Sequence, residues 1–168
     1  MQKTGISFGI RRLLVGLLAA AVLATLPTLA HANLGSVAEG WNNDAIEWFD
    51  LEDGRAEQKK TGKPMMVVIH TTWCPFCKKY SRHFYDQRVV DLAKSFVMVM
   101  MDRDLEKTET AKLGPGVNYM PRTLFYTPDG TLRPEIKGAN IEFPHWLDHD
   151  SPEELVAAMT KASTSQSK

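Results

Sequence analysis

The sequence predicts an α/β protein, with a central mixed β-sheet flanked by helices on both faces. Two continuous apolar runs, 65–69 and 96–101, are bounded by turn signals, which is typical of strands buried on both faces. Helical patterns lie between and around these runs, and the only two cysteines stand where the first run gives way to a helix. A chain of 168 residues with this alternation predicts one domain organised around the sheet.

Three elements precede the cysteines. The aromatic-rich stretch 45–49 predicts a short edge strand. Residues 51–61 are highly charged and predict a helix, which ends at Gly62 in the C′ position with Pro64 shortly after. The apolar run 65–69 then predicts a central strand that leads directly to the cysteines.

After the cysteines the helical pattern continues. Aromatic residues recur at helical spacing through 79–86, and apolar residues carry the pattern through 89–95 after a kink. The run 96–101 predicts a second buried strand that ends at Asp102, and its methionines are assigned to the core rather than to a copper site. Residues 103–118 are charged and then glycine-rich, which predicts a helix that gives way to a loop.

The last third of the chain returns to the sheet and ends in a helix. Residues 123–126 predict a third strand, and the Pro-Asp-Gly turn at 128–130 predicts that 132–136 returns as its hairpin partner. The stretch 138–149 is irregular. Residues 151–154 have the form of a capping box with proline at the first helical position, and open the last helix.

The two ends of the chain carry signals of their own. Residues 1–32 predict a secretory signal peptide, with a basic start, an apolar core and a small-x-small cleavage site at 30–32; an uncleaved anchor is the alternative. A flexible lead-in over 33–40, a folded domain over 41–162 and a disordered tail over 163–168 follow.

Charge and export narrow the function. Loss of the signal removes three basic residues (Lys3, Arg11 and Arg12) and no acidic one, so 20 basic against 20 acidic residues become 17 against 20. No basic patch indicates a nucleic-acid partner, and no second hydrophobic segment indicates a stable membrane domain. Export together with one cysteine pair predicts an oxidising location, in the periplasm or outside the cell, and we expect a monomer there.

Cys74 and Cys77 are separated by two residues at the start of a predicted helix. Unpaired N–H groups and the helix dipole stabilise a thiolate at Cys74, whereas Cys77 lies one turn further in and is more shielded. This predicts a redox pair in which Cys74 attacks and Cys77 resolves the mixed disulfide. An inert disulfide over so short a loop would constrain little of the unfolded chain.

Two other uses of the pair fit the sequence less well. A haem attachment site needs histidine directly after the second cysteine, where the chain has Lys78. A structural zinc site needs four ligands, and the nearby His70 and His83 do not repeat the spacing of known zinc modules. We therefore expect no bound metal.

Two separated motifs, Trp73-Cys74-Pro75-Phe76-Cys77-Lys78 and Met120-Pro121, carry a resemblance to the thioredoxin superfamily over roughly residues 41–161. The resemblance implies the thioredoxin fold, a cis peptide bond before Pro121, and a Met120 backbone that pairs with an extended substrate segment. No dissociable cofactor is implied, because the cysteine pair is the redox group. The implied catalytic residues are Cys74, Cys77 and Pro121, and the implied substrate-binding residues are Trp73, Pro75, Phe76 and Met120.

A narrower resemblance lies in the framework of the domain. The small single-domain thioredoxin proteins of the endoplasmic reticulum and the related anterior gradient family look similar in five segments: Trp41-Asn42, Trp48-Phe49-Asp50, Gly62-Lys63-Pro64-Met65-Met66, Phe96-Val97-Met98-Val99 and Tyr119-Met120-Pro121-Arg122. That subgroup is linked to disulfide formation and isomerisation in secreted proteins, so an exported bacterial-type relative is expected.

The chain departs from the family pattern at two positions. Many relatives carry a buried acid six residues before the first cysteine, where this chain has Val68. His70 and Asp102 are the substitute candidates for moving the Cys77 proton, with a hydrogen-bonded strand end and an exposed carboxylate as their alternative roles. Strongly oxidising relatives place histidine between the cysteines, whereas Phe76 cannot donate a hydrogen bond to the thiolate.

These observations predict an exported thiol–disulfide oxidoreductase that acts on protein disulfides. Its expected partners are proteins with thiols or disulfides and a second thiol–disulfide protein that returns the pair to its starting state. Trp73 is expected to shield the pair, with a plain core position as the alternative. Three other functions remain open: a dedicated disulfide reductant, a metal-binding chaperone that uses the two cysteines, and a redox-inert module that keeps the fold for its groove.

Overall fold

The computed structural model describes residues 38–114 and 118–164. These residues form a four-stranded sheet of order β1-β3-β2-β4, in which β1, β3 and β2 are parallel and β4 is antiparallel to β2. The predicted α/β fold with a mixed sheet is confirmed. In chain order the elements are β1 (Trp48–Phe49), α1 (Leu51–Thr61), β2 (Met65–His70), α2 (Pro75–Tyr80), the 3-10 helix η1 (Ser81–Tyr85), α3 (Gln87–Ala93), β3 (Val97–Asp102), α4 (Lys107–Lys112), β4 (Arg122–Tyr126) and α5 (Glu153–Thr164).

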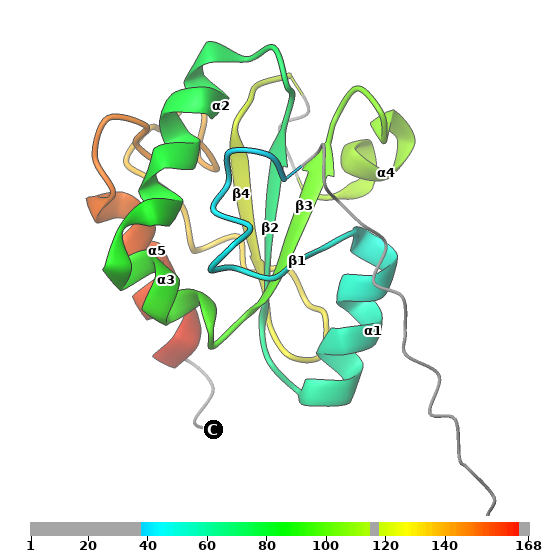
Figure 1. The fold of residues 1–168 in the computed structure, drawn as a ribbon. Coiled ribbons are helices and arrows are strands. Elements are labelled where there is room, and N and C mark those ends of the chain that lie inside the picture. Colours follow the sequence, from blue (N-terminus) through cyan, green and yellow to red (C-terminus); the bar gives the residue numbers. More distant parts are fainter. Residues whose placement is uncertain (1–37, 115–117, 165–168) are drawn as a thin grey trace, which may run out of the picture.

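Strands β2 and β3 form the centre of the sheet. Every residue of both strands is buried, as the two apolar runs predict. Figure 1 shows α1 and α4 on one side of the sheet and α2, α3 and α5 on the other. Because β2 and β3 are parallel, their last residues, His70 and Asp102, lie side by side at one edge of the sheet. The two cysteines follow β2 at this edge.

Helix α1 has the bounds that the sequence predicts. Asp50 is its N-cap and accepts a hydrogen bond from the Asp53 N–H at 2.8 Å, and Gly62 ends it at a φ of 65°. The helix packs very closely on β3, because a Cβ added to Gly54 would lie 2.3 Å from the Val99 side chain. Glycine at position 54 therefore sets the distance between the helix and the sheet.

The helical region after the cysteines is broken once, as predicted. Helix α2 passes into η1, and Asp86 then adopts an extended conformation with a ψ of 127°. Its carboxylate accepts from the Arg88 N–H at 2.9 Å and so caps α3. The break turns the chain so that α3 packs against α5 on the same face of the sheet.

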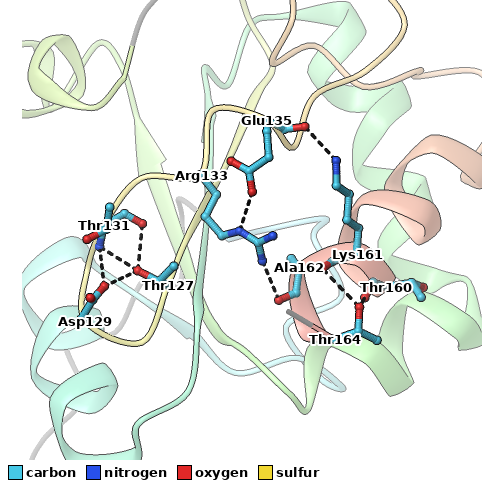
Figure 2. A network of polar contacts seen from close by, with 9 residues as sticks. All are labelled: Thr127, Asp129, Thr131, Arg133, Glu135, Thr160, Lys161, Ala162 and Thr164. Atoms are coloured by element: carbon cyan, nitrogen blue, oxygen red, sulfur yellow. Dashed lines mark hydrogen bonds and ion pairs between the residues drawn. The ribbon is translucent and has the colours of Figure 1, made fainter. Parts of the chain in front are cut away.

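The predicted hairpin strand over 132–136 is wrong. The turn forms, and the Arg133 N–H donates to the Phe125 carbonyl at 2.8 Å, but only an isolated bridge between Tyr126 and Leu132 follows. Pro134 has no N–H to continue the ladder. The chain instead turns toward α5, as Figure 2 shows: the Arg133 guanidinium donates to the Ala162 carbonyl at 3.1 Å.

The start of α5 differs from the predicted capping box. Ser151 Oγ accepts from the Glu153 N–H at 3.4 Å, but the Glu154 carboxylate does not return to Ser151. It accepts instead from the Asp148 N–H at 2.8 Å and the Ala139 N–H at 3.0 Å, and so fastens the irregular segment 138–149. At its other end the helix runs through Thr164, two residues into the predicted tail.

The N-terminal boundary also differs in detail. Strand β1 covers only residues 48–49 of the predicted 45–49, because residues 41–45 form turns in which Asn42 has a φ of 56°. Ala38 is buried in the core, so the end of the predicted flexible lead-in is packed. The signal peptide over 1–32, the positions 33–37 and the last four residues lie outside the described residues. None of the helices within residues 38–114 and 118–164 combines the length and the apolar composition that a membrane span requires.

Candidate active site

Cys74 occupies the N-cap position of α2, directly after the turn that follows β2. Its Sγ accepts from the Cys77 N–H at 3.3 Å, and its own N–H donates to the Thr71 carbonyl at 3.2 Å. Pro75 stands at the first helical position, where its missing N–H costs no hydrogen bond. Both cysteines are thiols in this structure. The geometry therefore places Cys74 Sγ against the donor end of the helix, as the sequence predicts.

Cys77 lies behind Cys74 and is almost completely buried. Burial raises the pKa of the Cys77 thiol far above its ordinary value, and the hydrogen bond with Cys74 acts in the same direction, whereas a backbone hydrogen bond from Thr71 opposes it. Cys77 is therefore a protonated thiol at neutral pH. It has to lose this proton before it can act as a nucleophile, because the thiolate is the reactive form.

The second motif lies directly beside the first cysteine. The Met120–Pro121 peptide bond is cis, as the resemblance implies, and both residues are buried. The Cys74 thiol faces the Met120 carbonyl oxygen at 3.8 Å. Arg122, the next residue, begins β4 opposite Ile69 of β2. The antiparallel pairing of β2 and β4 thus brings two motifs that are more than 40 residues apart in the sequence to one point.

Trp73 lies outside the core, so the alternative of a plain core position is wrong. Its side chain is 63% exposed. The indole Nε1 donates to the Asp104 carboxylate at 2.7 Å, and the Arg103 guanidinium lies 5.8 Å from the ring centroid. Trp73 is thus held by the loop after β3, and it forms one rim of the site.

Phe76 forms an aromatic rim together with residues of the segment 138–149. Its side chain is 42% exposed, and its ring lies 5.2 Å from the Trp146 ring and 5.0 Å from the His149 ring. Trp146 also donates its indole N–H to His149 Nδ1 at 3.2 Å. Sequence reasoning did not assign Trp146 and His149 to the site. The dense aromatic content of an otherwise irregular segment was the available signal for them.

The position that carries an acid in many relatives is apolar here. Val68 is fully buried in the middle of β2. Of the two substitute candidates, Asp102 is 3% exposed, so its expected exposure is wrong. Its carboxylate accepts from the Asp104 N–H at 2.8 Å and helps to hold the loop after β3. His70 is also buried, beside Asp102, and it lines a cavity of about 360 Å³ together with Cys77.

Possible metal ligands gather elsewhere. Over residues 38–114 and 118–164, the group of carboxylate and imidazole atoms close enough to hold an ion consists of Asp148, His149 and Asp150, and it contains neither cysteine. Asp150 is already paired with the Lys79 ammonium group at 3.1 Å. His83, a candidate ligand beside the cysteines, instead contacts the Asp148 carbonyl at 3.1 Å through Nε2.

Comparisons with known proteins agree with this geometry. A family model described as thioredoxin-like matches residues 45–128. Anterior gradient protein 1 of Xenopus tropicalis is 31% identical over 134 residues, which cover 78% of this chain and 70% of that protein. Anterior gradient protein 3 of the same species is 30% identical over 152 residues, which cover 82% of this chain and 90% of that protein.

Solved structures share the fold at lower sequence identity. A thioredoxin from Thermus thermophilus matches 71% of this chain and 88% of its own, with a TM-score of 0.56 and 17% identity. A disulphide isomerase from Xylella fastidiosa Temecula1 matches 66% of this chain and 86% of its own, with a TM-score of 0.50 and 20% identity. The chain belongs to the thioredoxin-like family and is related to the anterior gradient proteins.

Proposed function

We propose that this protein is an exported thiol–disulfide oxidoreductase that acts on the disulfides of other proteins through Cys74 and Cys77. In general terms the chain is a thioredoxin-like thiol–disulfide oxidoreductase; the proposal adds the residues, the substrate class and the compartment. The observation that carries it is the position of Cys74 Sγ, 3.3 Å from the Cys77 N–H and 3.8 Å from the Met120 carbonyl, with Cys77 buried behind it.

The proposed chemistry has two exchange steps. The Cys74 thiolate attacks one sulfur of a client disulfide, so the client S–S bond breaks, a mixed disulfide forms, and the other client sulfur leaves as a thiolate that takes a proton from water. Cys77 then loses its proton and attacks Cys74 Sγ, which releases the second client thiolate. The protein pair is oxidised by two electrons and the client disulfide is reduced by two. The same steps in reverse donate a disulfide.

The site supports a protein substrate rather than a small molecule. The backbone of Met120 lies directly beside Cys74, where an extended client segment can pair with it as an added strand would. Phe76 and Trp73, which flank the first cysteine in the sequence, are both exposed. No dissociable cofactor takes part, so a second thiol–disulfide protein has to return the pair to its starting state.

Export is the part of the proposal that rests on the sequence. The basic and apolar start of the chain, with its small-x-small site, supports secretion. Thiol–disulfide exchange on secreted proteins belongs in an oxidising compartment, in the periplasm or outside the cell. Fractionation of cells, with N-terminal sequencing of the recovered protein, tests this part. A cytoplasmic protein that starts at Met1 would contradict it.

A trapping experiment tests the activity. In Cys77→Ala, Cys74 can attack a client but nothing resolves the product, so we expect mixed disulfides with client proteins to accumulate on non-reducing gels. Cys74→Ala is the matched control and should trap none. If Cys77→Ala forms no mixed disulfides, the two cysteines do not carry out disulfide exchange with proteins. That result would favour a redox-inert module that uses its groove.

The direction of electron flow is set by the reduction potential, which glutathione buffers measure. A value of about −120 to −180 mV, in the range of disulfide-forming enzymes, means that the protein donates or shuffles disulfides. A value of about −250 mV or lower means that it is a reductant with its own electron source. Stoichiometric retention of zinc or copper(I) that is lost in Cys74→Ser would support the metal-binding alternative instead.

A further inference from the structure

A cavity of about 360 Å³ lies against the buried cysteine. The residues around it that matter here are Cys77 and Lys78 of α2, His70 and Thr71 at the end of β2, and Glu39 near the start of the described chain. The volume is many times what one water molecule needs. The cavity therefore has room for water between Cys77 and the groups that line it.

One buried hydroxyl group in the wall of the cavity needs a hydrogen-bond partner. Thr71 is 1% exposed, and its Oγ1 has no hydrogen-bond partner within residues 38–114 and 118–164. Buried hydroxyl groups are nearly always satisfied, by protein or by ordered water. Because Thr71 borders the cavity, water that enters the cavity would satisfy this hydroxyl group. Cys77 and His70 line the same space.

Cys77 needs a proton acceptor in every cycle. Burial raises the pKa of its thiol, so the proton does not leave spontaneously at neutral pH. The position in β2 that would bring a carboxylate close, Val68, is aliphatic and fully buried. Glu39, His70 and Lys78 line the cavity together with Cys77. The Asp102 carboxylate also acts on the Cys77 thiol, but it is absent from this lining and already accepts from the Asp104 N–H at 2.8 Å. Of the lining residues, Glu39 and Lys78 are exposed to bulk solvent, whereas His70 is 3% exposed.

The surroundings of His70 fix its ring at the cavity. The Trp41 ring packs on it with a centroid distance of 5.1 Å. On the neighbouring strand β3 the buried Asp102 is its register partner, and the Arg103 N–H donates to the His70 carbonyl at 2.9 Å. The charged groups that face this region are thus Asp102, Glu39 and Lys78. Histidine is the side chain whose protonation changes near neutral pH, whereas an ammonium group has no free lone pair.

We propose that His70 accepts the proton of Cys77, through water in this cavity, when Cys77 resolves a mixed disulfide on Cys74. The inference rests on the proposed function and names the proton route of its second step. The Cys77 S–H bond breaks and its proton passes by way of water to the neutral imidazole of His70. The Cys77 thiolate attacks Cys74 Sγ, the bond from Cys74 to the client sulfur breaks, and the client sulfur leaves with the electron pair. In the reverse direction, the imidazolium returns the proton to Cys77 as it leaves.

One stopped-flow absorbance measurement can separate attack by Cys74 from resolution by Cys77. Reduced protein is mixed with an equimolar amount of 5,5′-dithiobis(2-nitrobenzoate), and released thionitrobenzoate is followed by its absorbance. Attack by Cys74 releases one equivalent, and resolution by Cys77 releases the second. The rate of the second phase is measured from pH 5.5 to 9 in the native protein, His70→Gln, His70→Ala, Glu39→Gln and the matched control His83→Gln. His83 is a second buried histidine, which is absent from the lining of this cavity.

We expect the first phase to change less than twofold in the two His70 variants. General base catalysis contributes about 10²–10⁴-fold, so the second phase at pH 7 should slow by at least about tenfold in His70→Gln. In the native protein, a plot of the second-phase rate against pH should show an inflection in the range where histidine titrates. This inflection should be absent in His70→Gln. Free imidazole should restore the second phase of His70→Ala, because the truncation enlarges the cavity, and should leave the first phase unchanged.

Four results would each overturn the proposal. One is a second phase in His70→Gln within twofold of the native rate. The second is an inflection that persists in His70→Gln, and the third is one that disappears in Glu39→Gln. The fourth, which needs no variant that folds, is a native second phase whose rate follows hydroxide concentration without an inflection. A native protein that releases a single equivalent and forms no Cys74–Cys77 disulfide would overturn the proposed function as well, which distinguishes the two failures.

Discussion

The substitution Glu154→Gln should loosen the aromatic rim of the active site without touching the cysteines. Glu154 lies at the start of α5, and its two carboxylate oxygens accept one hydrogen bond each, from the Ala139 N–H at 3.0 Å and the Asp148 N–H at 2.8 Å. These bonds hold both ends of the segment that carries Trp146, whose ring packs on Phe76. One side chain therefore fastens the segment to the helix.

The magnitude follows from the chemistry of the amide. Glutamine is nearly isosteric with glutamate, but it presents one acceptor oxygen and one NH₂ group. It can accept from only one of the two backbone N–H groups, and its own donor then faces the other. A hydrogen bond to a charged group contributes about 1.5–3 kcal/mol. Because Glu154 is half-buried and water can reach it, we expect the free energy of unfolding to fall by about 1–2 kcal/mol.

Urea denaturation of Glu154→Gln and of the matched control Glu153→Gln measures this difference. Glu153 precedes Glu154 on the same helix but is exposed and paired with Arg88 at 2.9 Å, so its loss should change the stability by less than about 0.5 kcal/mol. Native-state proteolysis within 138–149 should be faster in Glu154→Gln alone. If the two variants are equally stable and equally resistant, the carboxylate does not hold the segment and the reasoning fails.

Three further predictions concern other parts of the domain. Gly54→Ala should lower the unfolding free energy by about 1–2 kcal/mol despite better helix propensity, because its methyl group would overlap the Val99 side chain; a more stable variant would mean that α1 can shift away from the sheet. Burial lowers the pKa of His145, so the unfolded state binds its proton first, and stability should fall as the pH drops below about 6.5, by at most ~1.4 kcal/mol per pH unit; this contribution should be absent in His145→Gln, and an unchanged slope would contradict it. The Trp73 indole and a neighbouring guanidinium hold the pKa of Asp104 below its ordinary value, so Trp73 fluorescence should titrate below a pH of about 3.9 and lose this transition in Asp104→Asn.

The elements that could be predicted from the sequence are those whose signals are local. Helix α1 has the predicted bounds because its two ends are fixed by Asp50 and Gly62, each within one turn of the helix. Strands β2 and β3 lie where the apolar runs place them, since a strand buried on both faces needs nothing but apolar side chains. The position of Cys74 at the start of α2 also depends on a local signal, because the helix begins at the proline that follows it.

The features that could not be predicted depend on partners outside the local sequence pattern. Whether residues 132–136 pair with β4 or turn toward α5 is decided by Pro134 and by the contact of Arg133 with Ala162, 29 residues away. The Glu154 carboxylate had a local partner in the capping box, yet it binds two N–H groups of the preceding segment. No periodicity in the sequence encodes either choice.

The burial of Asp102 also depends on a contact that the sequence pattern does not encode. A charged residue at the end of a strand is usually exposed, but the loop after β3 folds back over it, and the Asp104 N–H satisfies its carboxylate at 2.8 Å. The same loop holds Trp73 through Asp104, so Trp73 is drawn away from the core to the rim. One turn after β3 therefore moves both residues from their expected positions.

Phe76 belongs to the aromatic rim and is absent from the lining of the cavity behind Cys77, so client recognition and resolution depend on different contacts of this chain. Its ring is held by Trp146 and His149, so it supplies an apolar contact beside Cys74 and no hydrogen-bond donor for the sulfur. The preference for a client should then depend on the aromatic rim, and the rate at which the mixed disulfide resolves should depend on the proton route behind Cys77. Glu154→Gln disturbs the rim, whereas His70→Gln disturbs the proton route. Because the two sets of contacts share no side chain, the double variant should bind a client as weakly as Glu154→Gln does. It should resolve the mixed disulfide as slowly as His70→Gln does, without a further change in either free energy.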